Sequence, residues 1–521
     1  MSDALTIAEL YATAARDAVR ARVAATSLDT EQHAAHGFAW VETAVEALRA
    51  LEAWGARQTG AAEALIVQIG TGETLAQLAG GLPMGQSEFI RPADFGLESH
   101  VPALLAAAQG NTPENRAALV ALLRDGAAIS DALDDELLDQ VRDQYRRFTD
   151  ARILPHAHGW HLANALIPDD VIAEMAALGT FGVCIPEEFG GLGLGKLVMC
   201  IVTEELSRGW IGTGSLGTRS EIAGELIMQG GTPEQRAHWL PRIASGEILP
   251  TAVFTEPDTG SDMASLQTRA VRTETGWEIS GAKNWITHAA RTDLMTLMAR
   301  TLPDVKGYAG LSMLLVPKPR GSEDNPFPAE GMSGSEIEVL GYRGMREYAL
   351  QFDAMVAPDD ALLGGEEGQG FKQLMRTFEG ARIQTAARAV GVARRALELG
   401  LAYAMDRKQF GQPLIAFPRV GDKLAMMVTD MVMARELTYF AARAKDSGKR
   451  CDIEAGMAKL HAARVAWANA DAALQIHGGN GYALEYEISR VLCDARILNI
   501  FEGAAEIQAQ VIARGKLHDR N

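Results

Sequence analysis

Apolar residues recur every three or four positions along most of the chain, which is the spacing of one buried helix face. We predict helix over residues 5–58 and again over 101–124. Between these stretches, residues 80–96 contain two prolines and several glycines and are predicted to form a loop. The periodic positions of the first stretch are Ile7, Leu10, Tyr11, Ala14, Ala18, Phe38, Val41, Val45 and Leu48.

The helical pattern continues over 136–250 and returns over 369–445 and 452–475. Between 251 and 358, short runs rich in apolar and β-branched residues are separated by Gly, Pro, Asn and Asp, as in an all-β unit. The order helices, strands, helices predicts an α+β fold rather than alternating βαβ units. The predicted strands are Thr251–Thr255, Gly276–Ser280, Asp293–Arg300, Leu311–Val316 and Tyr348–Phe352.

Charge is distributed unevenly along the 521 residues. The formal net charge is −18, and residues 1–135 hold 18 acidic residues against 8 arginines and no lysine. We therefore treat 1–135 as an acidic helical extension that differs in composition from the rest of the chain. Such an acidic protein is poorly suited to bind a nucleic-acid backbone.

Three further features bear on location. No apolar run approaches the roughly 18 residues of a membrane helix, and the first residues show no signal peptide. The four cysteines are widely spaced, which fits a reducing compartment better than a disulfide framework. We expect a cytoplasmic protein without a membrane segment.

Five segments carry candidate chemistry. In the first, a predicted strand ends in a polar turn whose N–H groups and hydroxyls could bind a flat heterocycle or a phosphate. In the second, an indole and a hydroxyl two residues apart are expected on the same side of a strand, where they could enclose an aromatic ring. Taken singly, an ordinary turn and a core tryptophan are the simpler interpretations. The segments are FTEPDTGSD (254–262), KNWITH (283–288), RKQFG (407–411), QIHGGNG (475–481) and ILNIFEGAAEIQ (497–508).

Together, in this order and at these intervals, the five segments resemble the acyl-CoA dehydrogenase family of flavoenzymes. The resemblance covers about residues 136–521. It implies an N-terminal helical domain (136–250), a middle β-barrel (251–360) and a C-terminal four-helix bundle (361–521), with the extension 1–135 added. It also implies that FAD lies extended between the β domain and the bundle.

The family's reaction implies a role for Glu502. A base removes a proton from the α-carbon of an acyl thioester while a hydride leaves the β-carbon for the flavin. By resemblance Glu502 is this base, and Gly503 after it lets backbone approach the substrate closely. The expected FAD contacts are Phe254, Thr255, Gly260, Ser261, Trp285, Ile286 and Thr287, together with Arg407, Phe410, Gln475, Gly478 and Gly479 from a neighbouring subunit.

The resemblance also implies contacts with the acyl-CoA substrate. Glu379 and Arg382 match the family's residues for the CoA chain, Arg514 matches another CoA contact, and Ser261 is expected to touch both FAD and substrate. Ala504 and Ala505 stand where most relatives have hydroxyl residues, which indicates a divergent branch. A flavin shared between subunits implies a homo-oligomer, and a helical layer added to it would favour a dimer over the common tetramer.

The acyl group is predicted from a looser resemblance. The extension, the tail and residues 215–226 are most similar to the branch that oxidises methylsuccinyl-CoA to mesaconyl-CoA, a step of the ethylmalonyl-CoA pathway. Residues 213–222 correspond to the wall of the family's acyl pocket, and here they include Arg219, a candidate cation for a substrate carboxylate. The alternative is that Arg219 points to solvent or pairs with Glu221.

Other functions stay open at this stage. The electron acceptor is expected to be electron-transferring flavoprotein, but the chain could act on another short-chain acyl-CoA, or could be an oxidase that uses O₂. A non-enzymatic, DNA-binding relative is a remote alternative. We expect no metal site, although His156, His158 and His161 lie close together in sequence.

Overall fold

The computed structural model describes residues 2–518, and the chain forms two compact units. One unit combines Met1–Gln140 with Thr385–Asn521, and the other is Val141–Gln384. Two helices, α7 (Glu136–Phe148) and α13 (Gly370–Asp406), each continue from one unit into the other.

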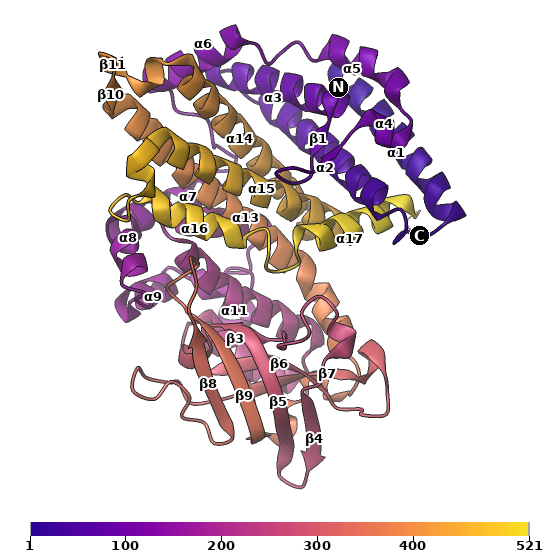
Figure 1. The fold of residues 1–521 in the computed structure, drawn as a ribbon. Coiled ribbons are helices and arrows are strands. Elements are labelled where there is room, and N and C mark those ends of the chain that lie inside the picture. The colour runs from indigo at the N-terminus through magenta and orange to yellow at the C-terminus, as the bar shows by residue number, and fades with distance from the viewer. Residues whose placement is uncertain (1, 519–521) are drawn as a thin grey trace. The chain divides into compact units, whose positions relative to one another are not determined.

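The first unit is almost entirely helical (Figure 1). Its only strands within the described residues are two short hairpins, β1 (Leu82–Pro83) with β2 (Phe89–Ile90) and β10 (Lys408–Gln409) with β11 (Gln412–Pro413). Besides parts of α7 and α13, its helices are α1 (Asp3–Ala25), α2 (Gln32–Gly55), α3 (Ala61–Gly80), α4 (Pro92–Phe95), α5 (Val101–Ala107), α6 (Pro113–Arg124), α14 (Pro418–Asp446), α15 (Asp452–His477), α16 (Ile488–Ile497) and α17 (Ala505–Leu517).

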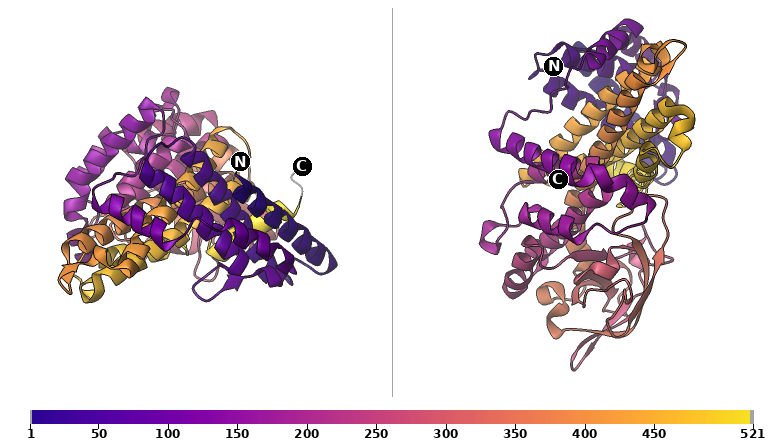
Figure 2. Two further views of the ribbon diagram at one scale, coloured as in Figure 1. Left: turned by 90° about the horizontal axis from the view of Figure 1, so that it is seen from above. Right: turned by 90° about the vertical axis from the view of Figure 1, so that its left-hand side faces the viewer.

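The extension shares one core with the C-terminal helices. Helix α2 packs on α14, α15 and α17, and both views of Figure 2 show the extension helices lying against them. Because α2 is enclosed in this way, it buries residues on nearly every side, including Phe38, Leu48 and Trp54. Ion pairs cross the same boundary, from Arg116 to Asp422 at 2.7 Å and from Lys516 to Glu42 at 2.9 Å.

The predicted helix over 5–58 is wrong in one respect, because it is two helices, α1 and α2. Ser27 closes a turn between them by accepting a hydrogen bond from the backbone N–H of Thr30. Residues 101–124 are likewise divided into α5 and α6, since Thr112 caps α6 through the N–H of Asn115. The spacing of apolar residues continues across these turns and so predicts one helix. The side-chain hydrogen bonds of Ser27 and Thr112 show where each helix is interrupted.

The second unit contains helices and a curled seven-stranded sheet (Figure 1). The strand order is β3-β6-β4-β5-β9-β8, with β7 paired to β6. The predicted α+β fold is confirmed. The elements are α8 (Leu154–Leu162), α9 (Asp169–Ala177), α10 (Lys196–Gly209), α11 (Ile211–Gly230), α12 (Pro233–Ala244), β3 (Pro250–Val253), β4 (Arg269–Thr273), β5 (Gly276–Thr287), β6 (Leu294–Arg300), β7 (Leu311–Pro317), β8 (Met332–Ile337) and β9 (Glu347–Ala357).

Two of these strands, β4 and β8, were missed by the search for apolar runs. Their sequences are RAVRT and MSGSEI, and most of their side chains are exposed. In addition, β8 pairs only with β9 and forms an edge of the sheet. A strand with so few buried positions contains no apolar run from which it could be predicted.

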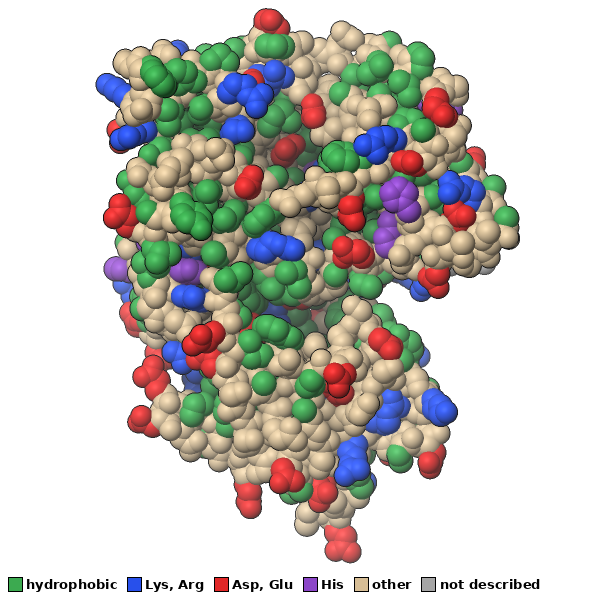
Figure 3. All heavy atoms as spheres, in the orientation of Figure 1, with side chains coloured by type: hydrophobic (Ala, Val, Ile, Leu, Met, Phe, Trp, Pro, Cys, Tyr) green, Lys and Arg blue, Asp and Glu red, His purple; other side chains and the backbone are tan. Residues whose placement is uncertain are grey.

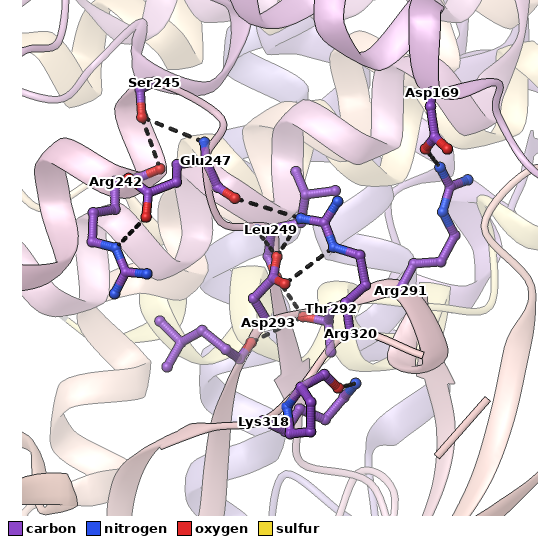
Figure 4. A network of polar contacts seen from close by, with 12 residues as sticks. Asp169, Arg242, Ser245, Glu247, Leu249, Arg291, Thr292, Asp293, Lys318 and Arg320 are labelled. Carbon is purple, nitrogen blue, oxygen red and sulfur yellow. Dashed lines mark hydrogen bonds and ion pairs between the residues drawn. The ribbon is translucent and has the colours of Figure 1, made fainter. Parts of the chain in front are cut away.

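Asp293 organises the start of β6 (Figure 4). Its carboxylate accepts a hydrogen bond from the backbone N–H of Leu249 at 2.8 Å and pairs with the guanidinium of Arg320, with Nε 3.1 Å away. The hydroxyl of Thr292 donates to the carbonyl of Leu249 at 2.6 Å. This network holds the segment after α12 against the first residues of β6. The strand that follows this segment, β3, then pairs with β6.

We expect Glu436→Gln to lower the free energy of unfolding by about 3 kcal/mol, because it leaves the guanidinium of Arg435 buried without its carboxylate. The two side chains are only 4% exposed, and Arg435 also donates to the carbonyl of Ser130 in the extension. Urea denaturation measures the change. In the control Asp125→Asn, the pair with Arg124 is exposed (56% and 66%), so a change within about 0.5 kcal/mol is expected. Equal changes in the two variants would contradict this account.

Candidate active site

Glu502 lies in the short loop between α16 and α17. Its backbone has φ 53°, and that of Gly503 has φ 91°, so two successive residues are left-handed. This conformation suits glycine but is uncommon for a residue with a side chain. The loop is closed by a hydrogen bond from the N–H of Ala505 to the carbonyl of Asn499 at 3.2 Å. A strained residue held in a closed loop is typical of a functional site.

The carboxylate of Glu502 is held by two residues of α13. Nη2 of Arg388 lies 2.8 Å from Oε2, and the hydroxyl of Thr385 donates to the same oxygen. The Arg388 side chain is fully buried, and its guanidinium lies over the ring of Phe501, 4.8 Å from the centroid. With only 15% of its side chain exposed, Glu502 is a dry carboxylate with a cation as partner.

Arg388 and Thr385 were not among the residues predicted from sequence. They stand one turn apart on the buried face of a helix whose neighbouring residues are mostly alanine and valine. An arginine on such an apolar face is the signal that could have identified them, because a buried cation requires a partner.

The first two segments expected at FAD lie side by side in the second unit. The N–H of Asn284 donates to the carbonyl of Thr255 at 2.8 Å. The ammonium of Lys283 reaches the carbonyl of Phe254 at 2.8 Å and the carboxylate of Glu256 at 3.0 Å. Burial lowers the pKa of Lys283 to about 8. Gly260 and Ser261 follow on an exposed turn.

The expectation that Trp285 and Thr287 share one side of a strand is wrong. The pairing of β5 with β9 shifts register between Lys283 and Ile286, and Trp285 has φ 60°. This bulge breaks the alternation of side chains. The indole of Trp285 is consequently 54% exposed, while Ile286 and Thr287 are buried.

Thr287 points instead to Glu347 on β9. Its hydroxyl lies 2.9 Å and 3.1 Å from the two carboxyl oxygens of Glu347. Burial raises the pKa of this carboxyl to about 7, against the opposing effects of the Thr287 hydrogen bond and the positive charge of Arg219. Burial also lowers the pKa of the adjacent His288 to about 3, so its ring is neutral.

Arg219 is buried on α11, with 8% of its surface exposed. The alternative in which it points to solvent is therefore wrong. Glu221, the other alternative partner, forms an ion pair with Lys196, whose ammonium also lies 2.9 Å from Glu225.

The remaining expected FAD residues are in the first unit and are exposed. Arg407 and Phe410 lie in and next to the β10–β11 hairpin, and 93% of Phe410 is exposed. Gln475, Gly478 and Gly479 follow at the end of α15. The ring of Tyr403 stacks on that of His477, 4.1 Å between centroids, which brings the end of α13 to the end of α15.

The expected CoA residues are spread over both units. Glu379 and Arg382 are partly buried on α13, where the Arg382 guanidinium lies 5.8 Å from the ring centroid of Phe378. Arg514 is exposed on α17. The structure gives the position of each residue within its own unit. The roles of these residues in CoA binding stay predictions.

The described residues offer neither a metal cluster nor a membrane helix. No group of three or more His, Cys, Asp and Glu side chains in residues 2–518 could hold a metal ion. Among the same residues, no helix has the length and apolar character to cross a membrane. On the face seen in Figure 3, acidic and basic side chains are interspersed.

Three family models match most of the chain. They describe the N-terminal domain (residues 135–247), the middle domain (251–355) and the C-terminal domain (368–517) of acyl-CoA dehydrogenase. The (2S)-methylsuccinyl-CoA dehydrogenase of Cereibacter sphaeroides is 59% identical over 98% of this chain and 97% of its own length. That alignment includes nearly all of the extension.

Two solved structures are similar to about three quarters of the chain. Butyryl-CoA dehydrogenase from Megasphaera elsdenii has a TM-score of 0.70 at 29% identity, covering 75% of this chain and all of its own. A glutaryl-coenzyme A dehydrogenase in complex with glutaryl-CoA also has a TM-score of 0.70, at 30% identity, covering 75% of this chain and 98% of its own.

Glu347 should make stability depend on pH. Its pKa is about 7 in the folded chain against an ordinary 4.5, so between these values only the folded state holds the proton. Its contribution to stability is thus lost as pH rises towards 7. Glu347→Gln stays neutral and keeps a partner for Thr287. The difference in free energy of unfolding, variant minus parent, should therefore increase by about 2 kcal/mol between pH 5 and pH 8.

Denaturation series at several pH values measure this difference. The exposed Glu338 offers a control, since Glu338→Gln also replaces a carboxylate by an amide but does so at the surface. A Glu347→Gln difference that is the same at every pH would show that Glu347 is ionised throughout.

Proposed function

The chain belongs to the acyl-CoA dehydrogenase family, and on that premise we propose that it oxidises (2S)-methylsuccinyl-CoA to mesaconyl-CoA. Its cofactor is FAD, as in the family. The relative that is 59% identical over nearly the whole chain supports this substrate. The observation that carries the proposal is the contact of Arg388 with Glu502.

The length of the substrate explains why this contact matters. In a succinyl thioester the free carboxylate is bonded directly to the β-carbon, which is next to the α-carbon that loses a proton. A cation for that carboxylate must therefore stand close to the base. Arg388, 2.8 Å from the proposed base, meets this requirement, and an arginine fork suits a carboxylate.

In the proposed mechanism Arg388 exchanges one carboxylate for another. Without substrate it pairs with Glu502 and allows that side chain to be ionised where little water reaches it. The carboxylate of the substrate then takes the guanidinium, and Glu502 loses its cation and becomes a stronger base. Glu502 removes the α-proton, and the chemistry that bound FAD would supply is a hydride acceptor for the β-carbon.

The residues expected at FAD are chemically suited to it. An exposed indole at Trp285 and an exposed phenyl ring at Phe410 can cover aromatic rings. The exposed turn with Gly260 and Ser261 offers backbone N–H groups, and the guanidinium of Arg407 suits a pyrophosphate. We propose Gly260, Ser261 and Trp285 as contacts with the FAD of their own subunit. Arg407, Phe410, Gln475, Gly478 and Gly479 are proposed to contact the FAD of a neighbouring subunit, and Glu379, Arg382 and Arg514 to contact CoA.

Arg219 is a second candidate cation for the substrate carboxylate. It is buried on the helix that corresponds to the family's acyl-pocket wall.

We expect Arg388→Met to lower kcat/KM for methylsuccinyl-CoA by about 100-fold, which is the cost of removing one partner of a buried charge pair. Its kcat/KM for butyryl-CoA should be kept or raised, since that substrate has no carboxylate for a guanidinium to bind. Arg219→Ala should likewise impair turnover of methylsuccinyl-CoA far more than of butyryl-CoA. Anaerobic flavin bleaching with both substrates, at equal flavin content, measures this. Equal losses on both substrates would contradict the role in carboxylate binding.

We propose electron-transferring flavoprotein as the acceptor and the cytoplasm as the location, on the resemblance and on the widely spaced cysteines. Reoxidation of the reduced flavin should be slow in air and fast with the acceptor protein. Rapid formation of H₂O₂ in air would favour the oxidase alternative.

We propose that the enzyme is a homodimer. The support is that the extension covers α14, α15 and α17, which leaves less of these helices for a second association. Light scattering of the full chain should give twice the 55.9 kDa of one chain. A tetramer would contradict the proposal.

A further inference from the structure

The backbone of the loop that carries Glu502 is held by two buried residues that are not part of any site described so far. Lys459 on α15 is 0% exposed, and its ammonium donates to the carbonyl of Gly503 at 2.6 Å. A charge-assisted hydrogen bond to a backbone carbonyl is stronger than a neutral one. This bond therefore fixes the plane of the peptide that follows Gly503.

Gln508 on α17 holds the backbone of both Gly503 and Glu502. Its side chain is 0% exposed, and Nε2 lies 3.2 Å from the carbonyl oxygens of both Glu502 and Gly503. A Cβ added at Gly503 would collide with Nε2. The glycine after the base thus lets Gln508 reach the backbone as well as permitting φ 91°.

These contacts oppose the strain of the loop. Glu502 has φ 53°, a conformation that a residue with a side chain leaves unless its surroundings specify it. The carbonyls of Glu502 and Gly503 precede the first turn of α17 and have no partner within that helix's hydrogen-bond pattern. Lys459 and Gln508, both fully buried, supply those partners.

We propose that Lys459 and Gln508 are positioning residues for the base. They fix the left-handed backbone of Glu502 and Gly503, and so direct the carboxylate to the α-carbon of the substrate. Arg388 and Thr385, by contrast, hold the carboxylate itself and release it when the substrate carboxylate arrives. The side-chain contact is exchangeable and the backbone contact is permanent. This inference rests on the proposed role of Glu502.

Two variants of matched shape separate positioning from charge. Lys459→Met and Gln508→Met each remove the hydrogen bonds and keep a long side chain, but only the first removes a positive charge. The groups facing the Glu502 loop are Arg388 and Thr385 from α13, Lys459 from α15 and Gln508 from α17. Both variants should slow reduction of the flavin by about 10- to 100-fold, with substrate affinity within about threefold of the parent. Lys459→Met alone should also move the acid limb of the kcat/KM profile to higher pH.

Stopped-flow reduction of the FAD-loaded enzyme, with substrate deuterated at the α-carbon or at the β-carbon, distinguishes positioning from a general structural role. A misdirected base makes proton removal slower, so the α-deuterium effect should increase in both variants. Gln510→Met on the same helix is the control, because Gln510 contacts His36 at 2.9 Å and not the loop. It should reduce at the rate of the parent.

Parent-like rates in both loop variants would overturn the inference. So would losses that follow melting temperature and flavin content with unchanged isotope effects, since these indicate stability alone. The parent is measured first with methylsuccinyl-, butyryl- and glutaryl-CoA, and the variants are then tested with the acyl-CoA that reduces its flavin. If none does, the proposed function fails, and this failure is seen before any variant is made.

Discussion

A base that removes a weakly acidic proton must be dry, and a dry carboxylate must have a partner. In this chain the two requirements meet in the ion pair of the proposed base, Glu502, with Arg388, whose guanidinium is fully buried. The pair requires α13 to present an arginine on an otherwise apolar face beside the loop between α16 and α17. It also requires Phe501 to cover the guanidinium. Helix packing in the first unit therefore serves an electrostatic need as well as a hydrophobic one.

The extension takes part in the same packing. Its helix α2 contacts α14, α15 and α17, and α15 and α17 carry Lys459 and Gln508. Its acidic excess is partly used at the boundary, where Glu42 pairs with Lys516. Compositional asymmetry pointed to an appendage, whereas the structure places residues 1–140 and 385–521 in one compact unit. A charge count along the sequence shows where the composition changes. It cannot show which helices of the two segments pack into one core.

The sequence predicted the features that depend on local pattern or on motif. The helix, strand, helix order and the family are confirmed, and Glu502 has the left-handed backbone of a constrained residue. The sequence could not predict features that depend on register or on contacts distant in the chain. The bulge that exposes Trp285 arises from the pairing of β5 with β9. Arg388 meets Glu502 across more than a hundred residues, and β8 has too few buried positions to form an apolar run. The roles of the expected FAD and CoA residues stay predictions.

Substrate choice and base strength are linked in this arrangement. In the proposed mechanism a monoacid thioester brings no group that could take Arg388 from Glu502, so the proposed base keeps its ion pair. In the same proposal, a methylsuccinyl thioester brings a carboxylate bonded to the β-carbon, next to the reacting α-carbon, and the exchange costs little because one ion pair replaces another. Discrimination of this kind needs no steric exclusion of the wrong substrate. It requires only that the backbone of the proposed base stay in place while its side chain changes partner, and the hydrogen bonds of Lys459 and Gln508 to the loop carbonyls serve that requirement.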